Sequence, residues 1–317
     1  MAEVLEKEYV GRLAPSPTGA LHLGNARTFM IAWLRARSLG GRVLLRIEDL
    51  DHPRDRPGAA ACAVEDLRWL GFDWDESCVQ SERHDIYRAA LERLGDLVYP
   101  CVCTRRDVEA AQSAPHDGDQ LRYPGVCRGR FASWDEALAY KSATCGGQGS
   151  PSARLPCWRF RVEPGTVVDF EDVFAGLVSQ DVSATLGDFP LARDRDGAGY
   201  TLACVVDDLL TGVTEVVRGD DLLAATPAQI LVARALGAEP PRYCHVPLVV
   251  GRDGRRLAKR HGDTRIAAFR EAGAKPEEVV GMLAASCGWA MRGEKVSLSG
   301  LLPRFNLASV PHAPFMV

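Results

Sequence analysis

The chain has 317 residues, of which 46% are hydrophobic and 25% charged, a globular composition and a length typical of about two domains. Its net charge of −4 excludes a strong overall attraction to nucleic acids, so any such contact must come from local basic patches. The charged N-terminus and the absence of a long apolar run favour neither a signal peptide nor a membrane span, and we expect a cytoplasmic protein without a membrane partner.

The first fifty residues have the pattern of a strand, a helix and a second strand. We expect a strand over residues 9–14, a helix over 25–41 and a buried strand over 42–49. Apolar residues such as Phe29 and Trp33 recur within the helix, and a pair of glycines closes it. A βαβ unit of this kind builds a parallel sheet and binds ligands where its strands end. The predicted fold class is therefore α/β.

The remainder of the chain divides into helical, irregular and strand-like stretches. Residues 105–157 are rich in Gly, Ser, Pro and Arg and poor in periodicity, so we expect a loop-rich insertion there. Residues 159–182 alternate in the manner of antiparallel strands, and the stretch 198–210 fits either a strand or a helix. The other expected elements are helices over 58–72, 82–98 and 226–236, a strand over 215–217, and a largely helical C-terminal region that ends in a proline-rich tail.

The sequence GRLAPSPTGALHLGNART, residues 11–28, places a Pro- and Gly-rich turn directly before the first helix. The unpaired N–H groups and the positive dipole end of a helix N-terminus suit an anion such as phosphate. His22 can donate a hydrogen bond to a phosphate oxygen, and Gly24, which has no Cβ, lets a flat ring approach the backbone. By itself such a stretch is more often only a connecting turn.

This stretch resembles the HIGH signature of the class I aminoacyl-tRNA synthetases, with HLGN over 22–25 at its positions. Together with LLRIEDLD over 44–51 it is similar to the glutamyl branch, whose members carry R-F-A-P-S-P-T-G-x-L-H-x-G-x-A-R-T and L-R-I-E-D-T-D. The resemblance implies a Rossmann-like catalytic domain in which His22 and Gly24 are catalytic residues. It also implies an ATP site formed here by Pro15, Ser16, Pro17, Thr18, Gly19, Ala20, Leu21, His22, Leu23, Gly24 and Asn25.

A second segment, GRDGRRLAKRHGDT over 251–264, resembles the KMSKS loop of the same enzymes in its K-L-S-K-R form. Lys259 is then the third expected catalytic residue, since it would hold the triphosphate of Mg²⁺-bound ATP in the transition state. Ala258 replaces the usual serine, which removes a hydroxyl but leaves the cation, so we expect an altered loop that still functions. The expected ATP contacts in this loop are Arg256, Leu257, Ala258, Lys259 and Arg260.

A glutamate substrate needs cations for its carboxylates and an acid for its ammonium group, and the planar fork of arginine pairs with a carboxylate in bidentate fashion. The resemblance implies that Arg12 and Arg218 bind the two carboxylates, with their individual assignment left open, and that Glu48 binds the ammonium group. Tyr200 would close the wall of the pocket and donate its hydroxyl. The expected glutamate-binding residues are Arg12, Leu13, Ala14, Pro15, Ser16, Glu48, Tyr200 and Arg218.

Cys101, Cys103 and Cys127 offer three thiolates, which can hold Zn²⁺ if a fourth ligand completes the tetrahedron. From the spacing alone that ligand is open: His116 has no ligand-like spacing, phenolate is an uncommon ligand, and three plain cysteines are an equal alternative. A C-x-C…Y-x-x-x-C zinc site is, however, typical of a shortened, queuosine-directed branch of the glutamyl family, which implies one structural Zn²⁺ per chain. The expected ligands are Cys101, Cys103, Tyr123 and Cys127, and the other cysteines are expected to be structural.

Only 57 residues follow Arg260, whereas a full glutamyl-tRNA synthetase continues into helical domains that read the anticodon. We therefore expect no anticodon-binding domain. The expected organisation is two halves of the catalytic domain over 1–104 and 191–245, an acceptor-type insertion over 105–190 whose zinc site starts at Cys101, and a KMSKS loop with a helical, stem-contact-like region over 246–317.

The activity implied by the resemblance is ATP-dependent activation of L-glutamate to glutamyl-adenylate without tRNA, followed by transfer of the glutamyl group to queuosine in the anticodon loop of tRNA(Asp). Three alternatives stay open: a truncated or discriminating glutamyl-tRNA synthetase that charges a tRNA 3′ end, a non-catalytic RNA-binding paralogue, and a nucleotidyltransferase of the same superfamily that acts on another carboxylate. We expect a monomer. The candidate contacts to tRNA phosphates are Arg105, Arg106, Arg122, Arg128 and Arg130.

Overall fold

A parallel sheet forms the centre of the molecule. The computed structural model describes residues 8–17, 20–50, 58–110, 122–144, 155–195, 197–255, 257 and 263–317. Strands β1 (Val10–Leu13), β2 (Arg42–Ile47) and β3 (Glu76–Val79) are parallel and adjacent in that order. On the other side of β1 lies β9 (Glu215–Gly219), which pairs in parallel with β10 (Arg242–Val246). The predicted α/β class is confirmed.

The two groups of strands are joined by contacts between β1 and β9. The Thr214 amide donates to the Val10 carbonyl over 2.9 Å, and the Arg12 side chain donates to the Val217 carbonyl over 2.7 Å. The carboxyl ends of β1, β2 and β9 therefore lie together at one edge, which is where a parallel sheet of this kind offers a ligand site.

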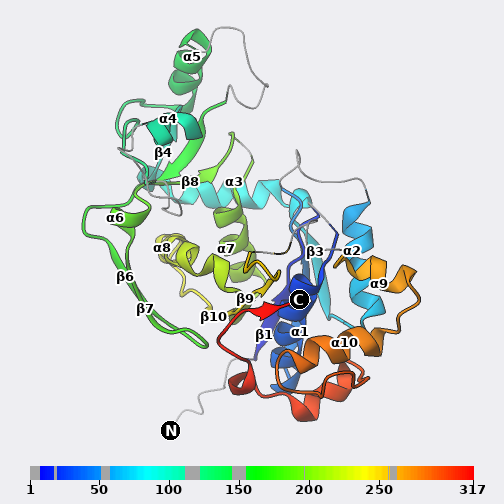
Figure 1. Cartoon of the computed structure of the whole chain (residues 1–317). Helices are drawn as coiled ribbons and strands as arrows, with labels where there is room; N and C mark the ends of the chain where they lie inside the picture. The colour runs from blue at the N-terminus through cyan, green and yellow to red at the C-terminus, as the bar shows by residue number, and fades with distance from the viewer. Residues whose placement is uncertain are drawn as a thin grey trace.

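Helices cover both faces of the sheet (Figure 1). Helix α1 (Leu23–Ser38) and helix α10 (Pro276–Ala285) share one hydrophobic core with the strands. Helices α3 (His84–Arg93), α7 (Tyr200–Leu210) and α8 (Thr226–Ala235) share a second core on the opposite face. The split follows the period-two alternation of a strand, since β2 sends alternate side chains into the two cores. Two of its residues, Val43 and Leu45, belong to the first core and Leu44 to the second.

A small antiparallel sheet carries the inserted segment at the top of Figure 1. Strand β5 (Cys157–Phe160) pairs with β4 (Val98–Cys101) on one side and with β8 (Phe189–Ala192) on the other. Helices α4 (Arg105–Ala110) and α5 (Trp134–Thr144) lie against it. This sheet supports the cysteine cluster described below.

A hairpin within the same inserted segment returns to the catalytic part of the molecule. Strands β6 (Val167–Asp172) and β7 (Gly176–Asp181) are antiparallel, as the alternation over 159–182 predicts. The last residue of β6, Asp172, also pairs with Tyr243 of β10. The described elements not yet named are α2 (Ala59–Trp69), α6 (Val182–Thr185), α9 (Ile266–Glu271), β11 (Val249–Val250), β12 (Phe315–Met316), and the short 3₁₀ turns Gln80–Glu82, Gly95–Leu97, Asp220–Ala225, Ser299–Arg304 and Leu307–Ser309.

The structure corrects three expectations about secondary structure. The helix expected over 82–98 ends at Arg93, because Gly95 adopts a positive φ of 49° and the strand β4 begins at Val98. The insertion expected to be loop-rich contains α5, whose start carries an overlooked capping signal: Ser133 Oγ accepts from the Glu136 amide over 3.2 Å. The stretch after α10 is not helical but consists of 3₁₀ turns and the short strand β12.

The open choice over 198–210 is resolved in favour of the helix α7. The domain boundaries expected from the sequence remain predictions. Among the described residues, no helix combines the length and the apolar character needed to cross a membrane.

Candidate active site

A cavity of about 350 Å³ opens at the carboxyl ends of β1, β2 and β9. Each of these strands delivers one charged side chain at its end, and the N-termini of α1 and α7 complete the walls. Its lining includes most of the residues that the sequence predicts for glutamate and several of those predicted for ATP. These are Arg12, Ala14, Ser16, Glu48, Tyr200 and Arg218, with His22, Gly24 and Asn25.

Two buried arginines provide the positive charge of the cavity. Arg12 and Arg218 each expose 6% of their surface. One nitrogen of Arg12, Nη1, donates to the Val217 carbonyl over 2.7 Å, whereas its Nε is buried without a hydrogen bond among the described residues. Burial lowers the pKa of Arg12, and the nearby carboxylate of Asp208, which acts to raise it, offsets this only in part. The Arg12 Nε lies 4.0 Å from Asp208 Oδ1, which is an ion pair but leaves the Nε–H without a hydrogen bond. A buried cation with an unused donor beside a cavity is suited to an anionic ligand, because a buried donor without an acceptor is costly.

The carboxylate of Glu48 is fixed in orientation before any ligand arrives. Its Oε1 accepts from Arg46 Nη2 over 3.0 Å and from Cys204 Sγ over 3.3 Å. Its Oε2 lies 3.5 Å from the Ser16 hydroxyl. Arg46, which is fully buried, also donates to Asp208 Oδ1 over 2.5 Å. Glu48 therefore presents a defined acceptor edge to the cavity, as binding of an ammonium group requires.

Arg46 and its partner Asp208 hold Glu48 in place without lining the cavity, and neither was among the site residues assigned from the sequence, which left Asp208 open between shaping the pocket and capping a helix. The available signal was an arginine inside a strand that is otherwise apolar, since a buried charge needs a partner. The neighbouring Asp207 has a different role, because it accepts from Gln80, Arg83 and Tyr87 and so ties α3 to α7.

His22 caps the N-terminus of α1 (Leu23–Ser38) with its ring. The Nδ1 atom accepts from the amide of Gly24 over 3.1 Å and from that of Asn25 over 3.4 Å. Because Nδ1 is the acceptor, Nε2 carries the proton of the neutral ring, which is the donor that a phosphate oxygen needs. His22 and Gly24 both line the cavity.

Other residues of the expected ATP and glutamate sites support the cavity or lie outside the described part. Leu13, Leu21 and Leu23 are core residues, and the Pro15 carbonyl accepts from the Glu48 amide over 3.0 Å. Pro17 is buried and Ala20 exposed. The predicted residues outside the described ranges are Thr18, Gly19, Arg256, Ala258, Lys259 and Arg260.

The chain on both sides of the KMSKS-like loop lies at the cavity. Leu248 and Val249, which precede the loop, line it, and Leu257 within the loop packs against the first core. At the end of this segment the Thr264 carbonyl accepts from the Leu23 amide over 3.0 Å, and the next residue, Arg265, forms an isolated antiparallel β-bridge with His22. The two signature segments are thus anchored next to each other.

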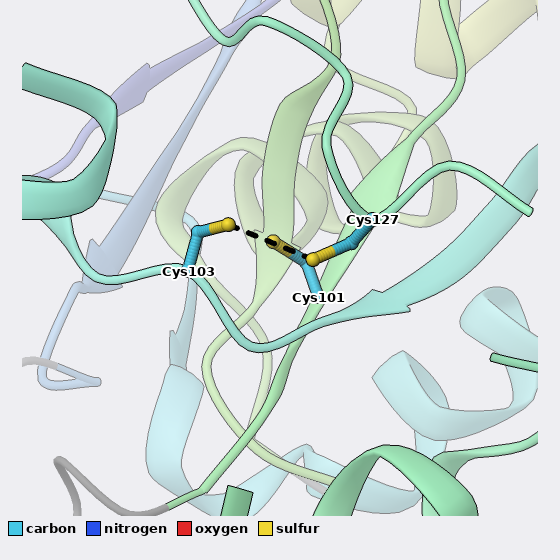
Figure 2. A group of neighbouring side chains, drawn as sticks. All are labelled: Cys101, Cys103 and Cys127. Carbon is cyan, nitrogen blue, oxygen red and sulfur yellow. Dashed lines mark hydrogen bonds between the residues drawn. The ribbon is translucent and has the colours of Figure 1, made fainter. Parts of the chain in front are cut away.

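Three cysteines and one tyrosine meet in the inserted segment, at the end of β4. Figure 2 shows the side chains of Cys101, Cys103 and Cys127 pointing toward one another, and their sulfurs all lie within 4.8 Å of one another. The Cys103 and Cys127 sulfurs are 3.6 Å apart. The Tyr123 hydroxyl lies 3.3 Å from the Cys101 sulfur and 3.6 Å from the Cys103 sulfur.

These separations fit a tetrahedral metal site. Zn–S bonds of about 2.3 Å separate two tetrahedral thiolates by about 3.8 Å. The guanidinium of Arg159 lies 3.8 Å from the centre of the Tyr123 ring and its Nε 3.2 Å from the Cys101 sulfur, so a cation offsets the charge of anionic ligands. Cys157 lies opposite Cys101 in the β4–β5 pair but outside the group of three sulfurs.

The candidate RNA-contacting arginines differ in their surroundings. Arg105 and Arg106 are exposed on α4, and Arg130 stacks over the Tyr140 ring at 4.4 Å. Arg128 forms an ion pair with Asp188, to which its Nε donates over 3.0 Å. The Nε of Arg122 donates to the Ser183 carbonyl over 2.9 Å.

The fold and the cavity define the catalytic domain of a class I aminoacyl-tRNA synthetase, and residues 8–308 match the family model described as "tRNA synthetases class I (E and Q), catalytic domain". A glutamyl-Q tRNA(Asp) synthetase of Rhodopirellula baltica is 50% identical over 88% of this chain and 85% of its own. One of Symbiobacterium thermophilum is 46% identical over 97% of this chain and 95% of its own. The chain belongs to the glutamyl-Q tRNA(Asp) synthetase family, whose members are ligases.

A solved structure supports the same fold and family. The crystal structure of a glutamate tRNA ligase from Elizabethkingia meningosepticum in complex with its amino acid superimposes with a TM-score of 0.79 at 29% identity. The match covers 98% of this chain and 67% of that one. The predicted fold class and enzyme class are both confirmed.

Proposed function

We propose that the protein activates L-glutamate with ATP in the absence of tRNA, and then transfers the glutamyl group to queuosine in the anticodon loop of tRNA(Asp). The observation that carries the first step is that Arg12 and Arg218, both buried, share one cavity with Glu48 at the N-terminus of α1. Two cations and one acid are the set that the two carboxylates and the ammonium group of glutamate require. The second step is supported by the names of the relatives.

In this proposal the chain acts by positioning its two substrates. A carboxylate oxygen of glutamate attacks the α-phosphorus of ATP, the bond to the β-phosphate breaks, and pyrophosphate leaves. Glu48 and the two arginines hold the amino acid, while the His22 ring and the open backbone at Gly24 receive the nucleotide. Because both reactants are bound side by side, the reaction needs no protein nucleophile.

Lys259 and Mg²⁺ would supply positive charge to the triphosphate. Lys259 belongs to the KMSKS-like loop. Leu248 and Val249, which precede this loop in the chain, line the cavity. A cation there stabilises the charge that develops on the departing pyrophosphate. Mg²⁺ would accompany ATP and add to this positive charge.

The test of the first step is glutamate-dependent exchange of ATP with labelled pyrophosphate, measured with and without tRNA. Exchange without tRNA is the expected result. An absolute requirement for tRNA would favour a glutamate-tRNA ligase, and no exchange in either condition would favour a non-catalytic paralogue. Exchange driven by another carboxylate, with none for glutamate, would overturn the substrate assignment.

The acceptor requires a separate test. Labelled glutamate is expected to attach to queuosine-containing tRNA(Asp) and to resist removal of the tRNA 3′ end. Attachment to unmodified tRNA, or to the 3′ end, would instead identify a truncated or discriminating glutamyl-tRNA synthetase. The similarity to a glutamate tRNA ligase structure makes this the alternative to exclude.

We propose that the cysteine cluster holds one structural Zn²⁺ through Cys101, Cys103, Tyr123 and Cys127. Support comes from the sulfur spacing and from the soft thiolate donors, which favour zinc over harder ions. The ion would fix the inserted segment, whose exposed arginines Arg105 and Arg106 are proposed to contact tRNA phosphates. We also propose a monomer, and a cytoplasmic location because ATP and tRNA are both found there.

A further inference from the structure

A buried histidine contacts the arginine at the back of the cavity. His245 on β10 exposes 1% of its surface and does not line the cavity. Its Nε2 lies 2.9 Å from Nε of Arg218 and 3.1 Å from the Thr226 hydroxyl. Its Nδ1 lies 2.6 Å from Oδ2 of Asp172, the buried last residue of β6. Asp172, His245 and Arg218 therefore form a continuous chain of contacts that ends at the cavity.

The direction of each hydrogen bond in this chain is determined by chemistry. The Nε–H of an arginine can only donate, so Nε2 of His245 must accept. The proton of the neutral ring then lies on Nδ1 and is donated to Asp172 Oδ2. The other oxygen, Oδ1, accepts from the amides of His245, Phe174 and Ala175 over 3.1, 3.0 and 2.8 Å. These amides fix the carboxylate, and the carboxylate fixes the histidine tautomer.

Two of the three guanidinium nitrogens of Arg218 are held in this way. Nε donates to His245, and Nη2 donates to the Thr226 hydroxyl over 2.7 Å. Both contacts lie behind the arginine and leave Nη1 without a hydrogen bond among the described residues. An arginine held at two positions loses less rotational freedom when it binds a carboxylate.

We propose that His245 and Asp172 are positioning residues for Arg218, and that they set the affinity of the cavity for the glutamate carboxylate that Arg218 binds. The inference rests on the proposed function, because it assumes that Arg218 contacts glutamate. Its specific claim is that the acceptor character of His245 Nε2, imposed by Asp172, keeps Arg218 in its binding orientation.

The surroundings keep the histidine neutral. Burial lowers the pKa of His245, and Arg218 and Arg12 act in the same direction, while Asp172 opposes them. Asp220, which follows β9, also interacts with the ring electrostatically, and Tyr243 stacks beside it at 6.1 Å. A second proton would place a donor on Nε2 opposite the Arg218 donor and would break the contact.

The decisive variant is Asp172→Asn. The three amides that bind Oδ1 select the carbonyl oxygen of the new amide, so its NH₂ group replaces Oδ2 and faces Nδ1 of His245. The ring must then accept at Nδ1 and carry its proton on Nε2, where it opposes the Arg218 donor. We expect the KM for glutamate in pyrophosphate exchange to rise by about tenfold or more, with kcat and the KM for ATP changed by less than about threefold.

A pair of substitutions at His245 provides the matched control. His245→Leu removes the acceptor and is expected to raise the KM for glutamate as Asp172→Asn does. His245→Gln offers a side-chain oxygen that can accept from Arg218, so it is expected to restore much of the affinity. In the Gln background, Asp172→Asn should have no further effect on this KM. An additive effect would contradict action through the histidine. If Asp172→Asn does not fold, the comparison of His245→Leu with His245→Gln tests the inference, and equal KM values for glutamate in these two variants would overturn it.

The tautomer itself can be measured by ¹⁵N NMR of histidine-labelled protein. The expected result is a proton on Nδ1 of His245 in the wild type and on Nε2 in Asp172→Asn. A proton on Nε2 in the wild type would overturn the inference, and so would a folded Asp172→Asn variant with an unchanged KM for glutamate. No glutamate-dependent exchange in the wild type would instead overturn the proposed function, and the inference with it.

Discussion

The imidazole of His22 lies directly against the space that a side chain at residue 24 would fill. A Cβ built on Gly24 would approach Cε1 of His22 to 3.0 Å and Nδ1 to 3.1 Å, while the Gly24 amide donates to that same Nδ1. The missing side chain and the ring orientation are therefore two parts of one arrangement. The glycine of the HIGH-like signature therefore makes room for the histidine ring, in addition to the nucleotide contact that we propose for it.

We expect Gly24→Ala to displace the His22 ring by a few tenths of an ångström. Because small errors in position are costly in catalysis, kcat/KM for ATP in pyrophosphate exchange should fall by about tenfold. The KM for glutamate serves as the internal control and should change little, since the charged residues expected to bind it, Arg12, Glu48 and Arg218, lie on β1, directly after β2 and on β9. An equal loss for both substrates would indicate general damage to the site.

Arg46→Met should destabilise the protein strongly. It leaves the carboxylates of Glu48 and Asp208 buried without their shared partner, which typically costs about 3–5 kcal/mol. Urea unfolding followed by circular dichroism measures the change. Arg105→Ala, which removes an exposed ion pair with Glu109 on α4, is the control and should have little effect. Similar losses for the two variants would contradict the role of Arg46.

Cys127→Ser should abolish binding of zinc, and Cys157→Ser should not. Both sulfurs lie close to Cys101, but only the sulfur of Cys127 belongs to the group of three within 4.8 Å. Elemental analysis of the purified proteins gives the metal content, expected as about one Zn²⁺ per wild-type chain. Chelation should lower the melting temperature of the wild type and of Cys157→Ser. Loss of zinc from both variants, or from neither, would show that the ligand set is wrong.

The stability of the protein should fall as the pH decreases below about 6.5, the ordinary pKa of histidine. Burial lowers the pKa of His245 in the folded state, so the unfolded chain binds the proton first. This contribution is fully present above the unfolded pKa and decreases by up to about 1.4 kcal/mol per pH unit below it. The pKa of Asp172 is also lowered: burial raises it, but the hydrogen bonds from His245 and the backbone amides outweigh burial. Its contribution is lost only below the usual range of a carboxylic acid.

Unfolding measured between pH 7.5 and 5 separates the two groups. His245→Gln should reduce the slope of stability against pH in this interval, while leaving the loss at more acidic pH in place. An unchanged slope would mean that His245 binds its proton equally well in the folded and unfolded chains.

Lys259→Ala should slow glutamate activation by about 10²–10³-fold while the KM for glutamate changes little, because its charge acts on the triphosphate in the transition state. Arg252→Ala, which lies in the same segment but outside the expected ATP contacts Arg256 to Arg260, is the control and should retain activity. Ala258→Ser, which restores the usual serine, should be nearly neutral. A parallel loss of rate and of glutamate affinity in Lys259→Ala would contradict the assigned role.

The sequence by itself determined the local parts of this protein. The apolar run of β2, the turn before α1 and the helix α8 are visible in the sequence because they depend on neighbours in the chain. The signature residues from Arg12 to Asn25, with Glu48, Tyr200 and Arg218, could be assigned from a resemblance that local patterns carried. Local patterns also misled, since the helix expected over 82–98 gives way to β4 and the apparently irregular insertion contains α5.

Only the tertiary structure decided which distant groups meet. Arg46 on β2 pairs with Asp208 on α7, and His245 on β10 lies between Arg218 and Asp172. No spacing in the sequence predicts these contacts, because the residues lie on strands and helices that are far apart in the chain and meet only when the sheet is packed. The sequence identified the residues expected to contact the substrates. The packing of the sheet selected the buried charges that hold those residues in place, since each buried charge is stable only where the fold brings it a partner.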